Sequence, residues 1–174
     1  MKKLLLSLGI AVAALLALVF AGPAQPPTLA EQVRVSLVKI PYLSVFDNLS
    51  YSVDNGVVTL TGEAVQPIIK SYAEQNVKRV PGVTSVQNQI EVLPVSRFDD
   101  DIRLRTLSAV RNTSALYRYF LGVNPSIRIV VKNGHVTLDG IVNSQADKQL
   151  AFMAANRVPF VFSVTNSLRT TSNL

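Results

Sequence analysis

The segment NGVVTLTG at positions 55–62 returns as NGHVTLDG at positions 133–140, seventy-eight residues further along the chain. The same offset, without a gap, aligns the tripeptide Arg-Val-Pro at 79–81 with Arg-Val-Pro at 157–159. Similarity at a fixed offset over such a length is the signature of a duplicated structural unit. The chain therefore consists largely of two copies of one unit, and the pattern around each copy predicts its fold.

The first copy predicts the element order α-β-β-α-β. Residues 49–53 alternate between apolar and polar side chains, which is the period of a half-buried strand. Asn55-Gly56 is a strong hairpin signal because both residues tolerate positive φ, and Gly62 ends the return strand. A capping box, Thr28 with Glu31, starts a helix that ends before Pro41. A second helix is expected over about 66–80 and a third strand over 83–92.

The second copy predicts the same order with a longer first helix. Asp99 is expected to be the N-cap of this helix, which is predicted to continue to about Tyr119. The hairpin turn is then Asn133-Gly134, and Gly140 ends the return strand. A helix over about 144–157 and a strand over 161–168 complete the unit.

The beginning of the chain predicts export. Lys2 and Lys3 precede an uninterrupted apolar run over 4–21, and small residues follow it. This pattern indicates a signal peptide over 1–24, and the run is also close to the length that spans a bilayer. The protein is therefore expected in the periplasm, soluble if the leader is cleaved and otherwise anchored in the inner membrane facing the periplasm. With no cysteine, the chain has neither a disulfide nor a site for lipid attachment.

The positive charge is concentrated in the second half of the chain. Residues 25–95 carry five basic and six acidic side chains, a net charge of −1, whereas residues 96–174 carry ten and five, a net charge of +5. The second half is therefore the part that an anionic surface would attract. Nucleic acid is excluded as a partner because the predicted compartment is wrong and no dense basic stripe with interleaved aromatics is present.

The two units resemble the BON domain (bacterial OsmY and nodulation). The resemblance rests on NG-[VH]-V-T-L-[TD]-G, on the helix that ends in R-V-P and on V-x-S-V-x-N, and it covers domains at 28–94 and 98–170. It implies an α+β fold in which each three-stranded sheet is covered by two helices. The overall plan is similar to osmotically inducible periplasmic proteins and dual-BON outer-membrane maintenance proteins, which implies binding to phospholipid or envelope surfaces. Phe160 departs from the family glycine that Gly82 represents, so that turn is expected to be altered.

No set of residues in the sequence predicts catalysis. His135 is the only histidine, and its place after the hairpin glycine indicates an exposed strand residue rather than a catalytic base or a metal ligand. The aspartates at 99–101 can bind a hard cation in principle, but they fit helix capping and a favourable first turn better. No catalytic residue, metal site or cofactor is therefore predicted, and the protein is not expected to be an enzyme.

The remaining candidate is a surface in the second domain. Basic and aromatic side chains gather where its long first helix is expected to end, and such side chains suit an anionic membrane interface. Packing of the aromatic side chains against the sheet or the first domain is the alternative, and Phe160 and Phe162 are expected to make core or interdomain contacts. The predicted function is binding of anionic phospholipid in support of envelope integrity or of an osmotic or envelope stress response. The alternatives are a protein–protein interaction module for an envelope partner and, with no visible ligand cluster, a small-ligand binder. The candidate lipid-binding residues are Arg111, Tyr117, Arg118, Tyr119, Phe120 and Leu121.

Overall fold

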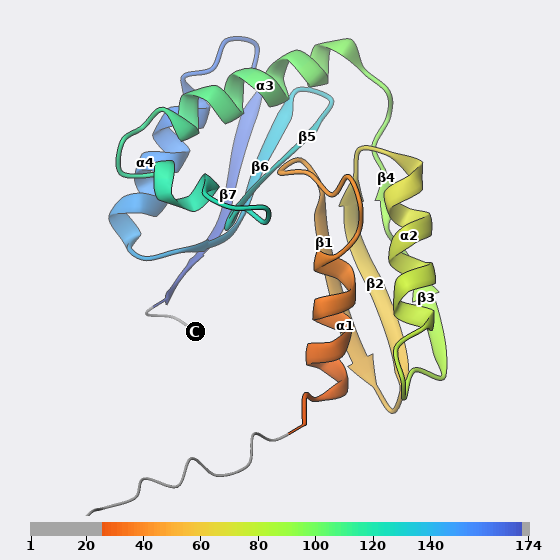
Figure 1. The fold of residues 1–174 in the computed structure, drawn as a ribbon. Coiled ribbons are helices and arrows are strands. Elements are labelled where there is room, and N and C mark those ends of the chain that lie inside the picture. The colour runs from red at the N-terminus through yellow and green to blue at the C-terminus, as the bar shows by residue number, and fades with distance from the viewer. Residues whose placement is uncertain (1–25, 172–174) are drawn as a thin grey trace, which may run out of the picture.

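The computed structural model describes residues 26–171, which form two α-β-β-α-β units (Figure 1). The predicted signal peptide, 1–24, lies outside the described residues. The α+β fold and the order of elements are confirmed. The first unit contains α1 (Leu29–Val38), β1 (Asn48–Asp54), β2 (Val57–Ala64), α2 (Pro67–Lys78), β3 (Ser85–Asn88) and β4 (Glu91–Val92). The second contains α3 (Arg97–Arg111), the 3-10 helix η1 (Tyr117–Phe120), β5 (Ile127–Lys132), β6 (His135–Val142), α4 (Gln145–Asn156) and β7 (Ser163–Thr170).

Both sheets have the same topology. The hairpin strand β2 lies between β1, which is antiparallel to it, and β3, which is parallel to it; β6 lies likewise between β5 and β7. The turn residues Asn55 and Asn133 have φ of 48° and 52°, and the glycines that follow them are also left-handed, as a type I′ hairpin requires. The third strand of the first unit is interrupted, because β3 and β4 pair separately with β2.

Each unit has its own core, built by two helices on one face of its sheet (Figure 1). Apolar residues at helical spacing in α1 and α2 meet alternate residues of β2, and α3 and α4 meet β5 and β6 in the same way. An asparagine fixes the third strand to the second helix in both units. The side-chain amide of Asn88 donates to the Lys70 carbonyl at 2.9 Å, and that of Asn166 to the Lys148 carbonyl at 2.8 Å.

The first helix of the second unit differs from the expectation at both ends. Its N-cap is Ser96, whose hydroxyl accepts from the Asp99 N–H, so the prediction of Asp99 as N-cap is wrong. The helix ends at Arg111, so the predicted extension to Tyr119 is also wrong. Asn112 and Thr113 turn their side chains back onto the last turn, to Ser108 and the Ala109 carbonyl, and residues of this kind compete with helix propagation.

The turn at Phe160 keeps the conformation that glycine has in the first unit. Phe160 has φ of 69° and Gly82 has φ of 92°, and both are left-handed. The Val161 N–H donates to the Val158 carbonyl, as the Val83 N–H donates to the Val80 carbonyl. The expectation of an altered turn is therefore wrong: the backbone is retained, and the phenylalanine carries the steric cost of positive φ.

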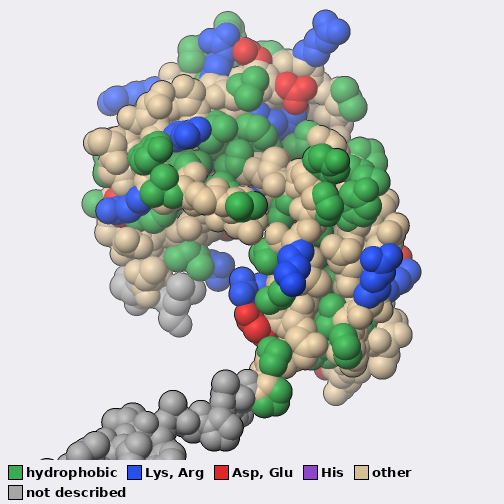
Figure 2. Space-filling view, viewed as in Figure 1, with side chains coloured by type: hydrophobic (Ala, Val, Ile, Leu, Met, Phe, Trp, Pro, Cys, Tyr) green, Lys and Arg blue, Asp and Glu red, His purple; other side chains and the backbone are tan. Residues whose placement is uncertain are grey.

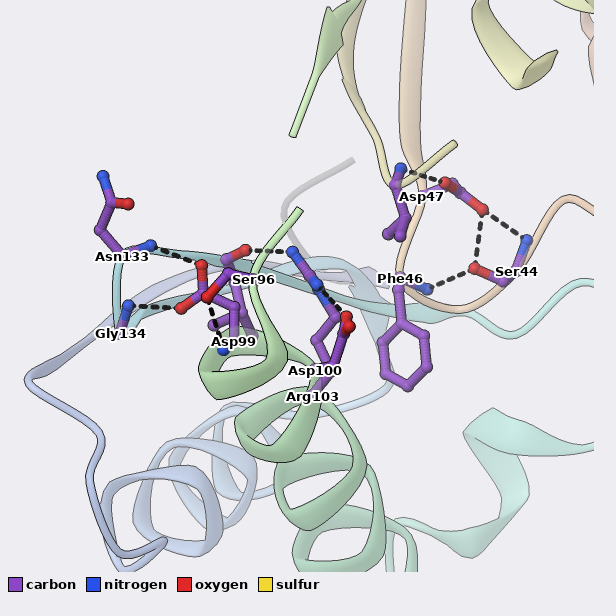
Figure 3. Close-up of polar contacts among 11 residues, drawn as sticks. Ser44, Phe46, Asp47, Ser96, Asp99, Asp100, Arg103, Asn133 and Gly134 are labelled. Atoms are coloured by element: carbon purple, nitrogen blue, oxygen red, sulfur yellow. Dashed lines mark hydrogen bonds and ion pairs between the residues drawn. The ribbon is translucent and has the colours of Figure 1, made fainter. Parts of the chain in front are cut away.

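The loop between α1 and β1 packs against the second unit. The ring of Phe46 packs against the core of the second unit. Next to it, the Val45 carbonyl accepts from the Ile129 N–H at 2.9 Å, and the Ser44 carbonyl accepts from the Arg128 guanidinium at 2.8 Å. Asp47 holds the loop in shape, because its carboxylate accepts from the Ser44 N–H and hydroxyl and from the Val65 N–H (Figure 3). The first unit thus contributes one aromatic side chain to the packing of the second.

Carboxyl groups also meet at this junction. The side-chain amide of Asn48 donates to the Asp139 carboxylate at 2.9 Å, and Lys132 pairs with Glu91 at 2.6 Å. The Glu63 carboxyl lies close enough to the Glu91 and Asp139 carboxylates to feel their charges. Burial raises the pKa of Glu63, and the charges of Glu91 and Asp139 add to that rise, against a hydrogen bond from Asn48.

The raised pKa predicts a pH-dependent stability. The folded state holds the Glu63 proton more tightly than the unfolded chain does, so stability decreases as pH rises from the unfolded pKa through the folded one. We expect Glu63→Gln to match the parent near pH 4 and to be more stable than the parent at pH 7, in urea unfolding over this range. Glu74→Gln is the matched control, because hydrogen bonds from Lys78 and Asn88 lower the pKa of Glu74. Its effect on stability at pH 7 should therefore have the opposite sign, and this variant should be less stable than the parent. A Glu63→Gln variant that is less stable at pH 7 would contradict the prediction.

Candidate membrane-binding surface

Five of the six residues predicted from sequence lie on the short segment that follows α3, and the sixth, Arg111, ends that helix. Arg111 is the last residue of α3, residues 117–120 form η1, and Leu121 follows η1. The structure brings four of these residues together in two pairs. The guanidinium of Arg111 lies 5.6 Å from the ring centre of Tyr117, and that of Arg118 lies 5.1 Å from the ring centre of Tyr119, both at cation–π distance.

Tyr119 anchors this segment to the second unit. Its side chain is only 6% exposed, and its hydroxyl donates to the Asp147 carboxylate at 2.8 Å. The same hydroxyl accepts from the Asn143 N–H, and the Tyr119 carbonyl accepts from the Ser126 N–H, both at 2.8 Å. Phe120 is half-buried against the core. Tyr119 and Phe120 therefore position the segment, and their rings do not form its outer surface.

Asp147 is the centre of this anchor. Its carboxylate is buried near the N-terminus of α4 and accepts from the Tyr119 and Ser144 hydroxyls and from the Arg118 guanidinium. Burial by itself would raise the pKa of Asp147, but the hydrogen bonds from Tyr119, Ser144 and Arg118 outweigh it and lower the pKa. Asp147 therefore stays ionised and binds η1 to α4.

The exposed side of the segment is apolar with an arginine beside it. Tyr117 is exposed, Leu121 is 57% exposed and Val123 is 87% exposed. Val123 was missed by the sequence reasoning, which followed a helix that the structure ends at Arg111; the Gly122 and Pro125 that flank it could have indicated a loop. We call Arg111, Tyr117, Leu121 and Val123 the loop surface.

A second group of exposed aromatics lies at the other end of α3. Phe98 lies 6.3 Å from Phe160 and 5.9 Å from Phe162 between ring centres, and Phe162 also meets His135. Phe160 is 64% exposed and Phe162 is 67% exposed, so the expectation of core or interdomain contacts for these two residues is wrong. We call Phe98, Phe160 and Phe162 the phenylalanine cluster. The first unit has Gly82 and Thr84 at the positions of Phe160 and Phe162, so the cluster is specific to the second unit.

Comparison with known families agrees with the repeat. The model of the BON domain matches residues 27–94 and residues 105–172. The chain belongs to the BON domain family. BON domains are generally non-enzymatic, and BON proteins are typically periplasmic or otherwise associated with the cell envelope.

Other comparisons add solved structures but no curated protein. Two structures of CdsD, a structural protein of the type III secretion system of Chlamydia trachomatis, match at 12% identity. One match covers 82% of this BON chain and 93% of that chain with a TM-score of 0.29. The other, to the C-terminal domain of CdsD, covers 83% and 98% with a TM-score of 0.30. No curated protein matches the sequence.

The side chains considered for chemistry are engaged within the BON fold. The Asp99 carboxylate accepts from the N–H groups of Asn133 and Gly134 in the hairpin turn (Figure 3). Asp100 pairs with Arg103 and Asp101 with Arg105. Within residues 26–171, His, Asp and Glu side chains form no group of three that could hold a metal ion. No helix in this part of the chain has the length and apolar character needed to cross a membrane.

Proposed function

We propose that this BON protein is a non-enzymatic periplasmic protein that binds anionic phospholipid membranes through its second unit and supports envelope integrity or the stress response. The observation that carries the proposal is the loop surface. It exposes apolar side chains next to a cation, on a segment that the Tyr119–Asp147 contact holds in place. Side chains of these kinds partition into the interface of a bilayer, where the apolar groups leave water and the cation meets lipid phosphate.

Charge supports the second unit as the contact. Basic side chains are more widespread than acidic ones on the face of the second unit seen in Figure 2. Among the arginines of the site, Arg111 is exposed and forms no ion pair within the described residues, whereas Arg118 is paired with Asp147. Of these two arginines, Arg111 is therefore the one available to a lipid phosphate.

The proposal predicts which substitutions weaken vesicle binding. Arg111→Gln should reduce binding to vesicles with phosphatidylglycerol about fivefold at low salt, since one basic residue contributes about 1 kcal/mol near an anionic leaflet. Tyr117→Ser with Leu121→Ser should remove the part of the binding that persists at high salt, which depends on apolar burial. The measurement is co-sedimentation with vesicles of phosphatidylglycerol and phosphatidylcholine, compared with phosphatidylcholine alone.

Matched controls come from outside the loop surface. Tyr42→Ser removes an exposed tyrosine from the first unit and should leave binding unchanged. All variants are made in the whole chain, because Phe46 of the first unit covers the core of the second and an isolated half would lose this contact. Normal vesicle binding by the Arg111 and Tyr117/Leu121 variants would reject the loop surface as the contact.

A protein-interaction module is the second candidate function, and the phenylalanine cluster favours it. Exposed aromatic side chains are enriched at protein interfaces, and Phe160 keeps an aromatic ring at a backbone position where glycine would relieve strain. Phe160→Gly, which restores the residue of the first unit, should retain the fold and vesicle binding. If it abolished vesicle binding instead, the membrane contact would lie at the phenylalanine cluster.

A further inference from the structure

Each unit has a groove along its first helix, and the two grooves are built from equivalent positions. Positions 32, 35, 36 and 39 of the first unit and positions 105, 108, 109 and 112 of the second line the two grooves, at a constant offset of seventy-three residues. The opposite wall comes from the end of the second helix and the Arg-Val-Pro segment that follows it, at 79–81 and 157–159. The duplication has therefore preserved a groove as well as a fold.

The groove of the first unit is the larger, at about 520 Å³ against about 320 Å³. Its volume is within the range of small-molecule sites, about 300–1,000 Å³. It extends along α1 from Pro27 to Lys39, and Val35, Val80 and Pro81 make much of its lining apolar.

The neutral polar side chains of this groove are already bonded to the protein. The side-chain amide of Gln32 donates to the Pro27 carbonyl, the Ser36 hydroxyl donates to the Val33 carbonyl, and the Asn76 amide donates to the Ser36 carbonyl. A peptide would need such groups to satisfy its own backbone. An occupant with an apolar body needs none of them.

Two cationic side chains in the groove are available to bind a ligand. Lys39 and Arg79 both line the groove, both are exposed, and neither forms an ion pair among residues 26–171. None of the described residues that line the groove is acidic. Two cations beside an apolar lining complement a molecule that has an anionic group on an apolar chain.

We propose that the groove between α1 and α2 binds a single-chain amphiphile with an anionic head group, such as a fatty acid or a lysophospholipid. The apolar chain lies against Val35, Val80 and Pro81, and the head group is bound by Lys39 and Arg79. This site is separate from the proposed membrane surface, which lies on the second unit. A protein that failed to bind vesicles would still bind the amphiphile.

The groove of the second unit is a weaker version of the same site. Arg157 is equivalent to Arg79, but the other cation, Arg105, is paired with Asp101 at 2.7 Å. Ser108 replaces Val35 in its lining, so the groove is also less apolar. One available cation and a smaller volume predict weaker binding there.

The test uses dodecyl phosphate below the concentration at which it forms micelles, titrated into isotopically labelled protein and followed by NMR. Saturable shifts of the amides at 28–39, at 76–80 and at 82 are expected. The double variant Lys39→Gln/Arg79→Gln should lower the affinity about tenfold, since two charge-assisted contacts are lost. Arg157→Gln is the matched control at the equivalent position and should leave the affinity of the first groove unchanged.

Two further probes separate the parts of the ligand. Inorganic phosphate has the anion without the chain, and dodecyl maltoside has the chain without the anion; both should bind at least about tenfold more weakly than dodecyl phosphate. Equal binding of either probe would overturn the proposal, as would an unchanged affinity in the double variant or the absence of saturable shifts. Both substituted side chains are exposed and without ion pairs in the described chain, so the fold should persist, and the amide spectrum of the variant checks this.

Discussion

Gly140→Ala should destabilise the protein by more than about 4 kcal/mol, a loss that single substitutions rarely reach. A Cβ at this position would lie 1.9 Å from the backbone oxygen of Ser126, and φ is 126°, where side chains are strongly disfavoured. The Ser126 carbonyl cannot withdraw without loss, because it accepts the N–H of Ile141 at 3.1 Å. The added Cβ therefore clashes with a backbone carbonyl that the sheet holds in place.

Two other glycines provide the comparison for this prediction. Gly62 occupies the equivalent place in the first unit, and its Cβ would lie 1.9 Å from the Asn48 oxygen, so Gly62→Ala should be as harmful. Gly122 also has positive φ, 85°, but a Cβ there would meet no atom of the described residues within 4 Å. Gly122→Ala should therefore lower the free energy of unfolding only by the cost of placing a non-glycine residue at positive φ, about 1–2 kcal/mol. Urea unfolding measures all three, and a Gly140 variant no worse than the Gly122 variant would contradict the predicted clash.

Asp147→Ala should cost about 3 kcal/mol at neutral pH and weaken vesicle binding, although Asp147 is buried. The substitution removes the acceptor of Tyr119, Ser144 and Arg118. One hydrogen bond to a charged group contributes about 1.5–3 kcal/mol, but the three share one carboxylate oxygen and Arg118 is exposed, so their contributions do not add in full. Without this anchor, η1 is no longer held on α4, and the loop surface loses its fixed arrangement. Binding should therefore fall without any change in the exposed side chains.

The pH dependence of this loss has a definite sign. Because the pKa of Asp147 is lowered in the folded state, its contribution is present above the unfolded pKa of about 3.9 and is lost as pH falls through the lower folded value. The stability deficit of Asp147→Ala should therefore shrink in acid. Tyr119→Phe keeps the ring and removes the hydroxyl, and a double-mutant cycle of the two should be non-additive. Additive losses would show that the hydroxyl and the carboxylate act independently.

The fold could be predicted from the sequence because its strongest signals are local and occur twice. The hairpin turns, the strand periodicity and the repeat offset all depend on neighbouring residues, and they led to the observed element order. The length of α3 could not be predicted in this way. Its apolar spacing continues past Arg111, but side-chain bonds from Asn112 and Thr113 end the helix.

The candidate site depends on contacts between distant parts of the sequence, and these were not visible. The sequence singled out Tyr119 as a surface aromatic, but the structure gives it a buried partner twenty-eight residues away, Asp147. It also suggested core positions for Phe160 and Phe162, where the repeat has a glycine and a threonine. Composition identified the charged half of the chain, whereas the accessibility of each side chain required the tertiary structure.

The loop between α1 and β1 also covers part of a sheet edge. Strand β5 is at the edge of its sheet, and edge strands present unpaired backbone groups that can recruit strands from other molecules. The Val45 carbonyl occupies the Ile129 N–H of this edge, and Phe46 covers the core beneath it. The first unit thus occupies part of the edge of the second sheet and leaves less of it open to other strands. In this duplicated small domain, one copy therefore shields an edge of the other as well as supplying a second copy of its surface.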